Sequence, residues 1–110
     1  MKLPENLVNK LNEKKNELGS KKYLVAIDYD DTFTTNKTVW TSVISLLRAN
    51  NFDVICVSAR TDSEYNRGVM SEFLPKIPLF LTQNSPKREF MLKRGFSVDI
   101  WVDDSPESIV

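Results

Sequence analysis

Acidic side chains stand in two close pairs along this chain, each directly after a short apolar run. Asp28 and Asp30 form the first pair, and Asp103 and Asp104 form the second. On an extended strand, two carboxylates separated by one residue point to the same side, about 6.6 Å apart at ~3.3 Å per residue, so Asp28 and Asp30 can face one ligand. Two like charges 4 Å apart repel by about 4 kcal/mol at an effective dielectric constant of ~20. If both pairs meet at one edge of a sheet, they predict a bound divalent cation.

The residue types that the chain lacks narrow the chemistry further. Its 110 residues include no His and a single Cys, Cys56, which excludes serine triads, Cys–His dyads, His-ligated zinc and disulfide frameworks. Acids, bases, nucleophiles and metal ligands must therefore come from carboxylates, Lys, Tyr, Ser and Thr. Hard oxygen ligands favour magnesium or calcium over softer metals. Cys56 lies within an apolar run, so we expect it in the core.

Four short apolar runs, rich in β-branched and aromatic residues, predict buried strands. They span residues 23–27, 54–57, 77–81 and 98–102. Helical patterns separate them, and this alternation predicts an α/β three-layer sandwich with a parallel, Rossmann-like sheet and the first strand in its centre. In open parallel sheets ligands bind outside the carboxyl ends of the strands. Both acidic pairs, and Ser58 and Arg60 after the second run, fall at that edge.

The first two intervening helices have recognisable faces and ends. The first is expected to present one apolar face and to end near Asn50; that face is Val39, Trp40, Val43, Ile44 and Leu47. Thr61 and Glu64 form a capping-box pattern that opens the second helix, which runs toward Leu74. The following proline then ends it.

The third predicted helix begins beside a lysine. Ser85 and Pro86 have the residue types of an N-cap and a first helical position, and Gly95 is expected to close the helix with Phe90 facing inward. Met91 is also expected to face inward. Lys87, close to the helix start, places an ammonium group near the same edge of the sheet.

Composition describes an ordinary globular chain. Hydrophobic residues make up 41% and charged residues 27%, which is far from the composition of disordered chains. Lys plus Arg equals Asp plus Glu at 15 each, so no net charge attracts nucleic acid or an anionic membrane. The length predicts a single folded unit over residues 21–110. The lack of a signal peptide or apolar span predicts a cytoplasmic protein without membrane association.

The N-terminal residues 1–20 form a separate predicted element. Leu7, Leu11 and Leu18 recur among polar residues between Pro4 and Gly19, which is typical of an amphipathic helix. Its apolar stripe is thin. We expect the helix either to cover the domain or to pair with another copy of the chain in a homo-oligomer.

The order of these features resembles the haloacid dehalogenase-like (HAD) phosphohydrolases over residues 22–108. The resemblance implies that Asp28 is the nucleophile that takes up a phosphoryl group. It implies that Asp30 protonates the leaving oxygen and then activates water, with Thr32 orienting the loop. It also implies magnesium held by the Asp28 carboxylate, the Asp30 backbone carbonyl, and Asp103 or Asp104.

The same resemblance assigns roles to the remaining polar side chains. Thr32 and Ser58 would lie at the substrate phosphate, with Ser58 donating a hydrogen bond to a phosphate oxygen. Lys87 would lie there too and would neutralise charge on the nucleophile and on the phosphate. Arg60 can bind substrate phosphate. Asp31 occupies a variable position of the motif, where we expect solvent or a turn.

Larger members of this family carry a cap domain, for which the connections of this chain are too short. An uncapped site is open, so we expect the substrate to be a phosphorylated small molecule or an exposed phosphoester on a larger molecule. Nucleic acid remains an open possibility. The chain also ends at Val110, where a further helix and strand are usual in the family. We therefore expect either a minimal version of the core without its C-terminal strand or a domain cut from a longer chain.

Three rival interpretations stay open at this point. A response-regulator receiver also gathers acids, Lys and magnesium, but it places its phosphoacceptor Asp after the third strand, where this chain has Leu81 and Thr82. A metal-dependent nuclease-like domain usually has a Glu first and its Asp-x-Asp later. A non-catalytic binding or regulatory module that keeps the HAD fold is the third.

Overall fold

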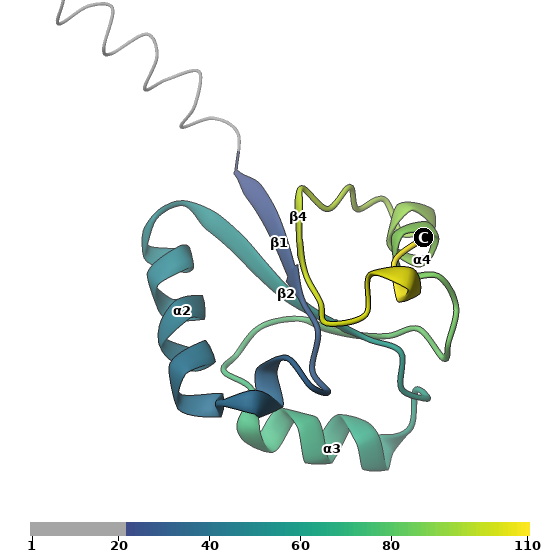
Figure 1. The fold of residues 1–110 in the computed structure, drawn as a ribbon, viewed down its shortest axis with the longest axis horizontal. Coiled ribbons are helices and arrows are strands. Elements are labelled where there is room, and N and C mark those ends of the chain that lie inside the picture. Colours follow the sequence, from purple (N-terminus) through teal and green to yellow (C-terminus); the bar gives the residue numbers. More distant parts are fainter. Residues whose placement is uncertain (1–21) are drawn as a thin grey trace, which may run out of the picture.

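A four-stranded parallel sheet forms the centre of the molecule (Figure 1). The computed structural model describes residues 22–110. The strands are β1 (Tyr23–Ile27), β2 (Phe52–Ser58), β3 (Leu79–Leu81) and β4 (Ile100–Val102), in the order β3-β2-β1-β4. All three neighbouring pairs are parallel. This confirms the predicted α/β class and the interior position of the first strand.

Helices cover both faces of the sheet. The helices are α2 (Lys37–Ala49), α3 (Glu64–Phe73) and α4 (Lys87–Lys93), with 3₁₀ turns η1 (Phe33–Thr35) and η2 (Pro106–Ser108). Ile44 of α2 and Met70 of α3 pack in one apolar cluster, whereas Met91 of α4 packs in a second cluster. Successive residues of a strand pack alternately in the two clusters, with Ile27 in the first and Ala26 in the second. The molecule therefore has the three layers that the sequence predicts.

Two strands are shorter than predicted, and each has a local cause. β3 begins at Leu79 because Pro78, which precedes it, has no N–H group to donate to a sheet ladder. β4 begins at Ile100 because, just before it, the carboxylate of Asp99 takes the place of a backbone carbonyl in the pairing with β1. Asp99 Oδ2 accepts a hydrogen bond from Leu24 N at 2.8 Å. By contrast, β2 is longer than its predicted run of 54–57.

Two predicted helix caps are wrong by one or two residues. Ser63, not Thr61, is the N-cap of α3, and its hydroxyl accepts a hydrogen bond from Asn66 N at 3.1 Å. Pro86, not Ser85, is the N-cap of α4. The segment before α3 holds several polar residues that can cap a helix, so the sequence pattern leaves the choice among them open. At α4, Pro86 makes no side-chain cap hydrogen bond, and its carbonyl accepts the first hydrogen bond of the helix, from Phe90 N at 3.0 Å.

Other local predictions have mixed outcomes. Gly95 follows α4 with a φ of +85°, as expected of a residue that ends a helix in the left-handed region. Asp31 is exposed in a turn with a φ of +57°, as expected. Val39 is exposed, although the helical pattern placed it on the apolar face of α2. The predicted helix over 1–20 lies outside the described residues.

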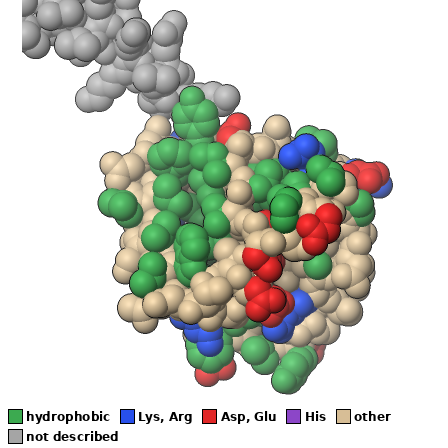
Figure 2. Space-filling model, viewed as in Figure 1, with side chains coloured by type: hydrophobic (Ala, Val, Ile, Leu, Met, Phe, Trp, Pro, Cys, Tyr) green, Lys and Arg blue, Asp and Glu red, His purple; other side chains and the backbone are tan. Residues whose placement is uncertain are grey.

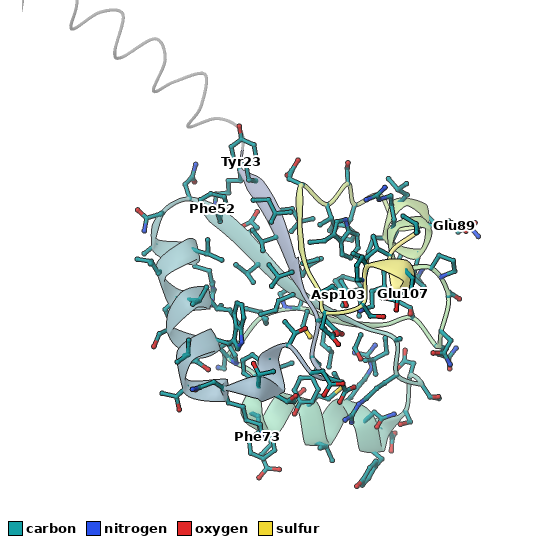
Figure 3. The ribbon with its side chains drawn as sticks, in the orientation of Figure 1. Tyr23, Phe52, Phe73, Glu89, Asp103 and Glu107 are labelled. Carbon is teal, nitrogen blue, oxygen red and sulfur yellow. The ribbon has the colours of Figure 1, made fainter. Side chains whose placement is uncertain are left out.

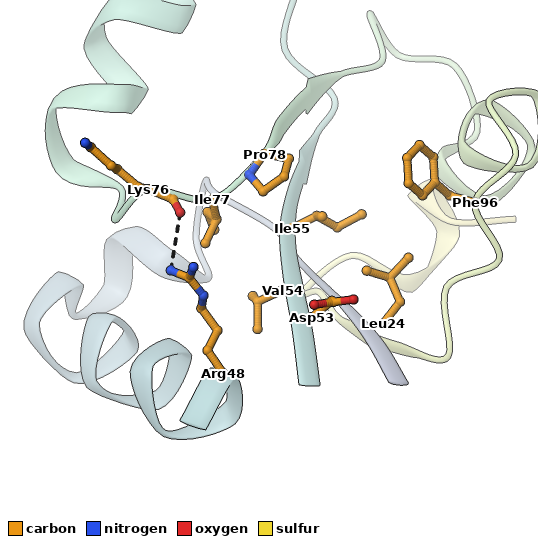
Figure 4. A pocket seen from close by; sticks show the side chains of 9 residues that line it. All are labelled: Leu24, Arg48, Asp53, Val54, Ile55, Lys76, Ile77, Pro78 and Phe96. Carbon is orange, nitrogen blue, oxygen red and sulfur yellow. Dashed lines mark hydrogen bonds between the residues drawn. The ribbon is translucent and has the colours of Figure 1, made fainter. Parts of the chain in front are cut away.

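The amino-terminal edge of the sheet carries a small pocket of about 230 Å³ (Figure 4). Ile77 and Arg48 lie on the Val54 side of β2, whereas Leu24 and Phe96 lie on its other side. Arg48 closes one wall by donating a hydrogen bond to the Lys76 carbonyl at 3.3 Å. This pocket is at the edge opposite the acidic pairs. No helix among residues 22–110 has the length and hydropathy to cross a membrane.

Candidate active site

The two acidic segments are brought together by the pairing of β1 with β4. Asp28 N donates a hydrogen bond to Val102 O at 2.9 Å, which extends the pairing past the end of β1. The segment after β4 then lies beside the segment after β1, and Figure 3 shows Asp103 there, close to Glu107 of η2. Acidic and basic side chains meet near the middle of the face seen in Figure 2, whereas hydrophobic side chains gather over α2 and β1.

Lys87 joins one acid from each pair, and we call Lys87, Asp28 and Asp103 the inner cluster. Lys87 Nζ donates to Asp28 Oδ1 at 3.0 Å and to Asp103 Oδ2 at 2.6 Å. The exposed fractions of the three side chains are 2%, 9% and 2% respectively. Asp103 Oδ1 also accepts a hydrogen bond from Ser105 N at 2.9 Å. The inner cluster is therefore a buried ion-pair network with its orientation fixed by the backbone after β4.

Burial raises the pKa of Asp28 to about 6. Lys87 lowers this pKa through its hydrogen bond and its charge, whereas the charge of Asp103 and a hydrogen bond with Asp104 raise it again. Because desolvation is the largest of these effects, one ammonium group does not fully stabilise the ionised carboxylate. A second cation at this position would favour the charged form.

Asp28, Asp103 and Asp104 each present a carboxylate oxygen within 4.8 Å of the others. Two oxygens on opposite sides of one hard cation are about 4–5 Å apart, because magnesium–oxygen and calcium–oxygen distances are about 2.0–2.6 Å. These three residues can therefore hold such an ion. Asp104 differs from Asp103 in that it is exposed, and its Oδ1 accepts a hydrogen bond from Thr32 Oγ1 at 3.2 Å.

Asp30 and Arg60 make a second ion pair, which we call the outer pair. Arg60 Nε donates to Asp30 Oδ2 at 2.8 Å, and a terminal nitrogen of Arg60 donates to Oδ1 at 2.7 Å. The exposed fractions are 32% for Arg60 and 47% for Asp30. The hydrogen bond to Asp30 raises the pKa of Arg60 further above its usual range. The predicted phosphate-binding role of Arg60 stays a prediction, since in the structure this guanidinium binds a carboxylate.

Thr32 and Ser58 lie at the same edge but bind protein groups. Thr32 is buried, and besides donating to Asp104 its hydroxyl accepts a hydrogen bond from Asp104 N at 3.3 Å. Ser58 is fully buried at the end of β2, where its hydroxyl accepts a hydrogen bond from Arg60 N at 3.2 Å. Both residues are thus placed to support the loops that carry Asp104 and Arg60. Their predicted contacts with phosphate stay predictions.

Sequence reasoning missed two residues that adjoin the site. Asn66 Oδ1 accepts a hydrogen bond from Arg60 at 3.4 Å, and nothing in the sequence marks an asparagine inside a helix as a partner of a distant arginine. Thr82 follows β3, and its buried hydroxyl has no hydrogen-bond partner among the described residues. Thr82 N donates to Ser58 O at 2.8 Å, so this residue adjoins the end of β2.

The site thus combines a buried lysine, two carboxylates bound to it, a third oxygen donor and an aspartate–arginine pair. The acidic oxygens of such an arrangement can hold a hard cation, and a carboxylate is one of the groups that can act as a nucleophile. Comparisons of the chain with protein-family models, with curated proteins and with solved structures find no match.

Proposed function

We propose that this protein is a magnesium-dependent phosphomonoester hydrolase that forms an aspartyl-phosphate on Asp28, in the manner of a HAD-like phosphatase without a cap domain. The observation that carries the proposal is the inner cluster. A nucleophilic carboxylate must approach an anionic phosphate, and Lys87 lies 3.0 Å from Asp28 with almost no exposure to solvent. In a water-poor environment, that fixed charge offsets the repulsion between nucleophile and substrate.

The reaction has two steps, each assigned to one carboxylate. In the first, an oxygen of Asp28 attacks phosphorus, the bond from phosphorus to the leaving oxygen breaks, and that oxygen takes a proton from Asp30. In the second, Asp30 takes a proton from water, whose oxygen attacks phosphorus, and the bond from phosphorus to Asp28 breaks. Inorganic phosphate and free Asp28 result. A positioned general acid or base contributes roughly 10²–10⁴ in rate, and with no His in the chain a carboxylate must fill this role.

We assign different roles to the two acids after β4, Asp103 and Asp104. Asp103 binds Lys87 through one oxygen and Ser105 N through the other, so we assign it to holding the lysine. Asp104 would hold magnesium together with the Asp28 carboxylate and, as the family resemblance implies, the Asp30 carbonyl. When bound, magnesium supplies positive charge that compensates the negative charge on the transferring phosphoryl group.

The substrate class follows from the connections between strands. One α-helix and one 3₁₀ turn link β1 to β2, and one helix links β2 to β3. We propose that the site therefore has no cap and takes phosphorylated small molecules or phosphoesters exposed on larger molecules.

Hydrolysis of p-nitrophenyl phosphate tests this function directly. We expect turnover with magnesium and its loss in excess chelator. Asp62→Asn is a suitable control, because Asp62 lies outside the site and binds the exposed Arg67. No turnover by folded protein with magnesium, or full turnover in chelator, would contradict the proposal. In the first case a non-catalytic binding module would be the better interpretation.

A further inference from the structure

We propose that Arg60 is a positioning residue for Asp30. This inference rests on the proposed function and deepens it, because it gives Arg60 a role in proton transfer instead of phosphate binding. Its basis is the two-point contact of the outer pair and the way in which Arg60 is itself held.

The contact of Arg60 with Asp30 fixes the orientation of the carboxylate. Two parallel N–H···O bonds of 2.8 Å and 2.7 Å join the side edge of the guanidinium to both carboxylate oxygens. Such paired bonds constrain both the distance and the plane of the carboxylate. Each oxygen keeps a second lone pair, which remains able to carry a proton. Asp30 can therefore act in proton transfer while Arg60 holds it.

Arg60 is supported by contacts with four residues from different parts of the chain. Its backbone N–H binds the hydroxyl of Ser58, and its carbonyl accepts a hydrogen bond from Gln83 N at 3.1 Å. Its second terminal nitrogen donates to Asn66 of α3 at 3.4 Å. The guanidinium also lies 5.3 Å from the centre of the Tyr29 ring, which is buried in the core. Because the Arg60 side chain is held in this way, it can fix the orientation of the Asp30 carboxylate.

A surface pair in the same molecule provides a matched comparison. Arg67 binds Asp62 in the same side-on geometry, with bonds of 2.6 Å and 3.1 Å. It is similarly exposed, at 44%, but it lies outside the candidate site. Replacing either arginine by lysine keeps the charge and removes the two-point geometry. The pair Arg60→Lys and Arg67→Lys thus separates the effect of position in the site from the general effect of the substitution.

The dependence of the rate on the leaving group distinguishes positioning from phosphate binding. A poor leaving group needs its oxygen protonated, whereas p-nitrophenolate leaves almost without help. The quantity to measure is kcat/KM, which reports the steps up to release of the leaving group. For Arg60→Lys we expect a fall of about 10- to 100-fold with phenyl phosphate or an alkyl phosphate and less than about threefold with p-nitrophenyl phosphate. Arg67→Lys should leave both values unchanged.

A second measurement places the effect at Asp30. In the Asp30→Asn background, Arg60→Lys should cause no further loss, because the group that it positions is already absent. Asn66→Ala removes a hydrogen-bond acceptor of Arg60, so it should reproduce the leaving-group dependence of Arg60→Lys in weaker form. This second variant keeps the test usable if Arg60→Lys folds poorly.

The possible outcomes separate the two proposals. An equal loss with all leaving groups, or an undiminished effect in Asp30→Asn, would overturn the positioning role and favour direct phosphate binding by Arg60. Absence of turnover in the unaltered protein would overturn the proposed function and this inference with it. Turnover in the unaltered protein with a uniform loss in Arg60→Lys would overturn the inference alone.

Discussion

The inner cluster and the outer pair use the same chemistry in different surroundings. Each joins one acid of the Asp28–Asp30 pair to a basic side chain from a distant part of the sequence. Lys87 is 2% exposed, whereas Arg60 is 32% exposed. A buried charge that loses its partner has no water to replace it, so removing one partner costs about 3–5 kcal/mol. An exposed ion pair stabilises a protein by only about 0–1 kcal/mol.

This difference separates what each pair contributes. The inner cluster is part of the folded structure, and it sets the charge around the proposed nucleophile. The outer pair adds little to stability, so its contribution is the orientation of one carboxylate. The two pairs should therefore respond differently to the same substitution.

The largest expected effect is the loss of turnover in Asp28→Asn. This variant exchanges one oxygen for an amide of similar size and removes the nucleophile, so we expect activity to fall by at least about 10³-fold. Lys87 keeps its bond to Asp103, so the variant should fold. Circular dichroism and steady-state kinetics check the two halves of this prediction. Undiminished turnover in the folded variant would show that Asp28 is not the nucleophile.

Removing the cation from each pair should produce unequal losses of stability. We expect Lys87→Met to lower the free energy of unfolding by about 3–5 kcal/mol, because Asp28 and Asp103 are left buried and unpaired. Arg60→Met should lower it by at most about 1 kcal/mol. Urea denaturation without added metal measures both. Equal losses would remove the distinction between the inner cluster and the outer pair.

A smaller effect should appear in the pH dependence of magnesium binding. The pKa of Asp28 is raised from 3.8 to about 6, so the folded state favours its protonated form. The stability that this group contributes is present below about 3.8 and is lost as the pH rises through about 6. Magnesium binds the ionised carboxylate, so it should raise Tm more at a pH of about 7.5 than at a pH of about 5. Each kcal/mol of stability that magnesium adds corresponds to a rise in Tm of roughly 4–8 °C.

Asp28→Asn is the matched control for this pH dependence, because its side chain does not titrate. The magnesium-induced rise in Tm should be smaller in this variant. It should also not increase as the pH rises through about 6. The same increase in both proteins would assign the pH dependence to another group.

The sequence predicts the arrangement of the fold better than the contacts at the site. Apolar runs of strand-like composition, such as Tyr23–Ile27, indicate the parallel sheet and the edge at which the acids gather. They do not indicate which acid binds which cation, because Lys87 is 59 residues from Asp28 and Arg60 is 30 residues from Asp30. Those contacts depend on the packing of α4 and on the path of the chain after β2.

Neighbouring residues of the same type show this limit most clearly. In the sequence, Asp103 and Asp104 are equivalent candidates for a metal ligand. In the structure Asp103 is bound to Lys87, whereas Asp104 is exposed and bound to Thr32. The bend of the backbone after β4 makes this difference, and no residue pattern encodes it. The assignment of magnesium, of the nucleophile and of the substrate stays a prediction.

Trapping of the covalent intermediate tests the central proposal most directly. Asp30→Asn keeps Asp28 but lacks the base for the second step, so with p-nitrophenyl phosphate and magnesium it should release about one equivalent of p-nitrophenol and then stall. Acid quenching and peptide mass analysis should locate one phosphoryl group on Asp28. A phosphoryl group on any other residue, or steady turnover without a covalent adduct, would contradict the account.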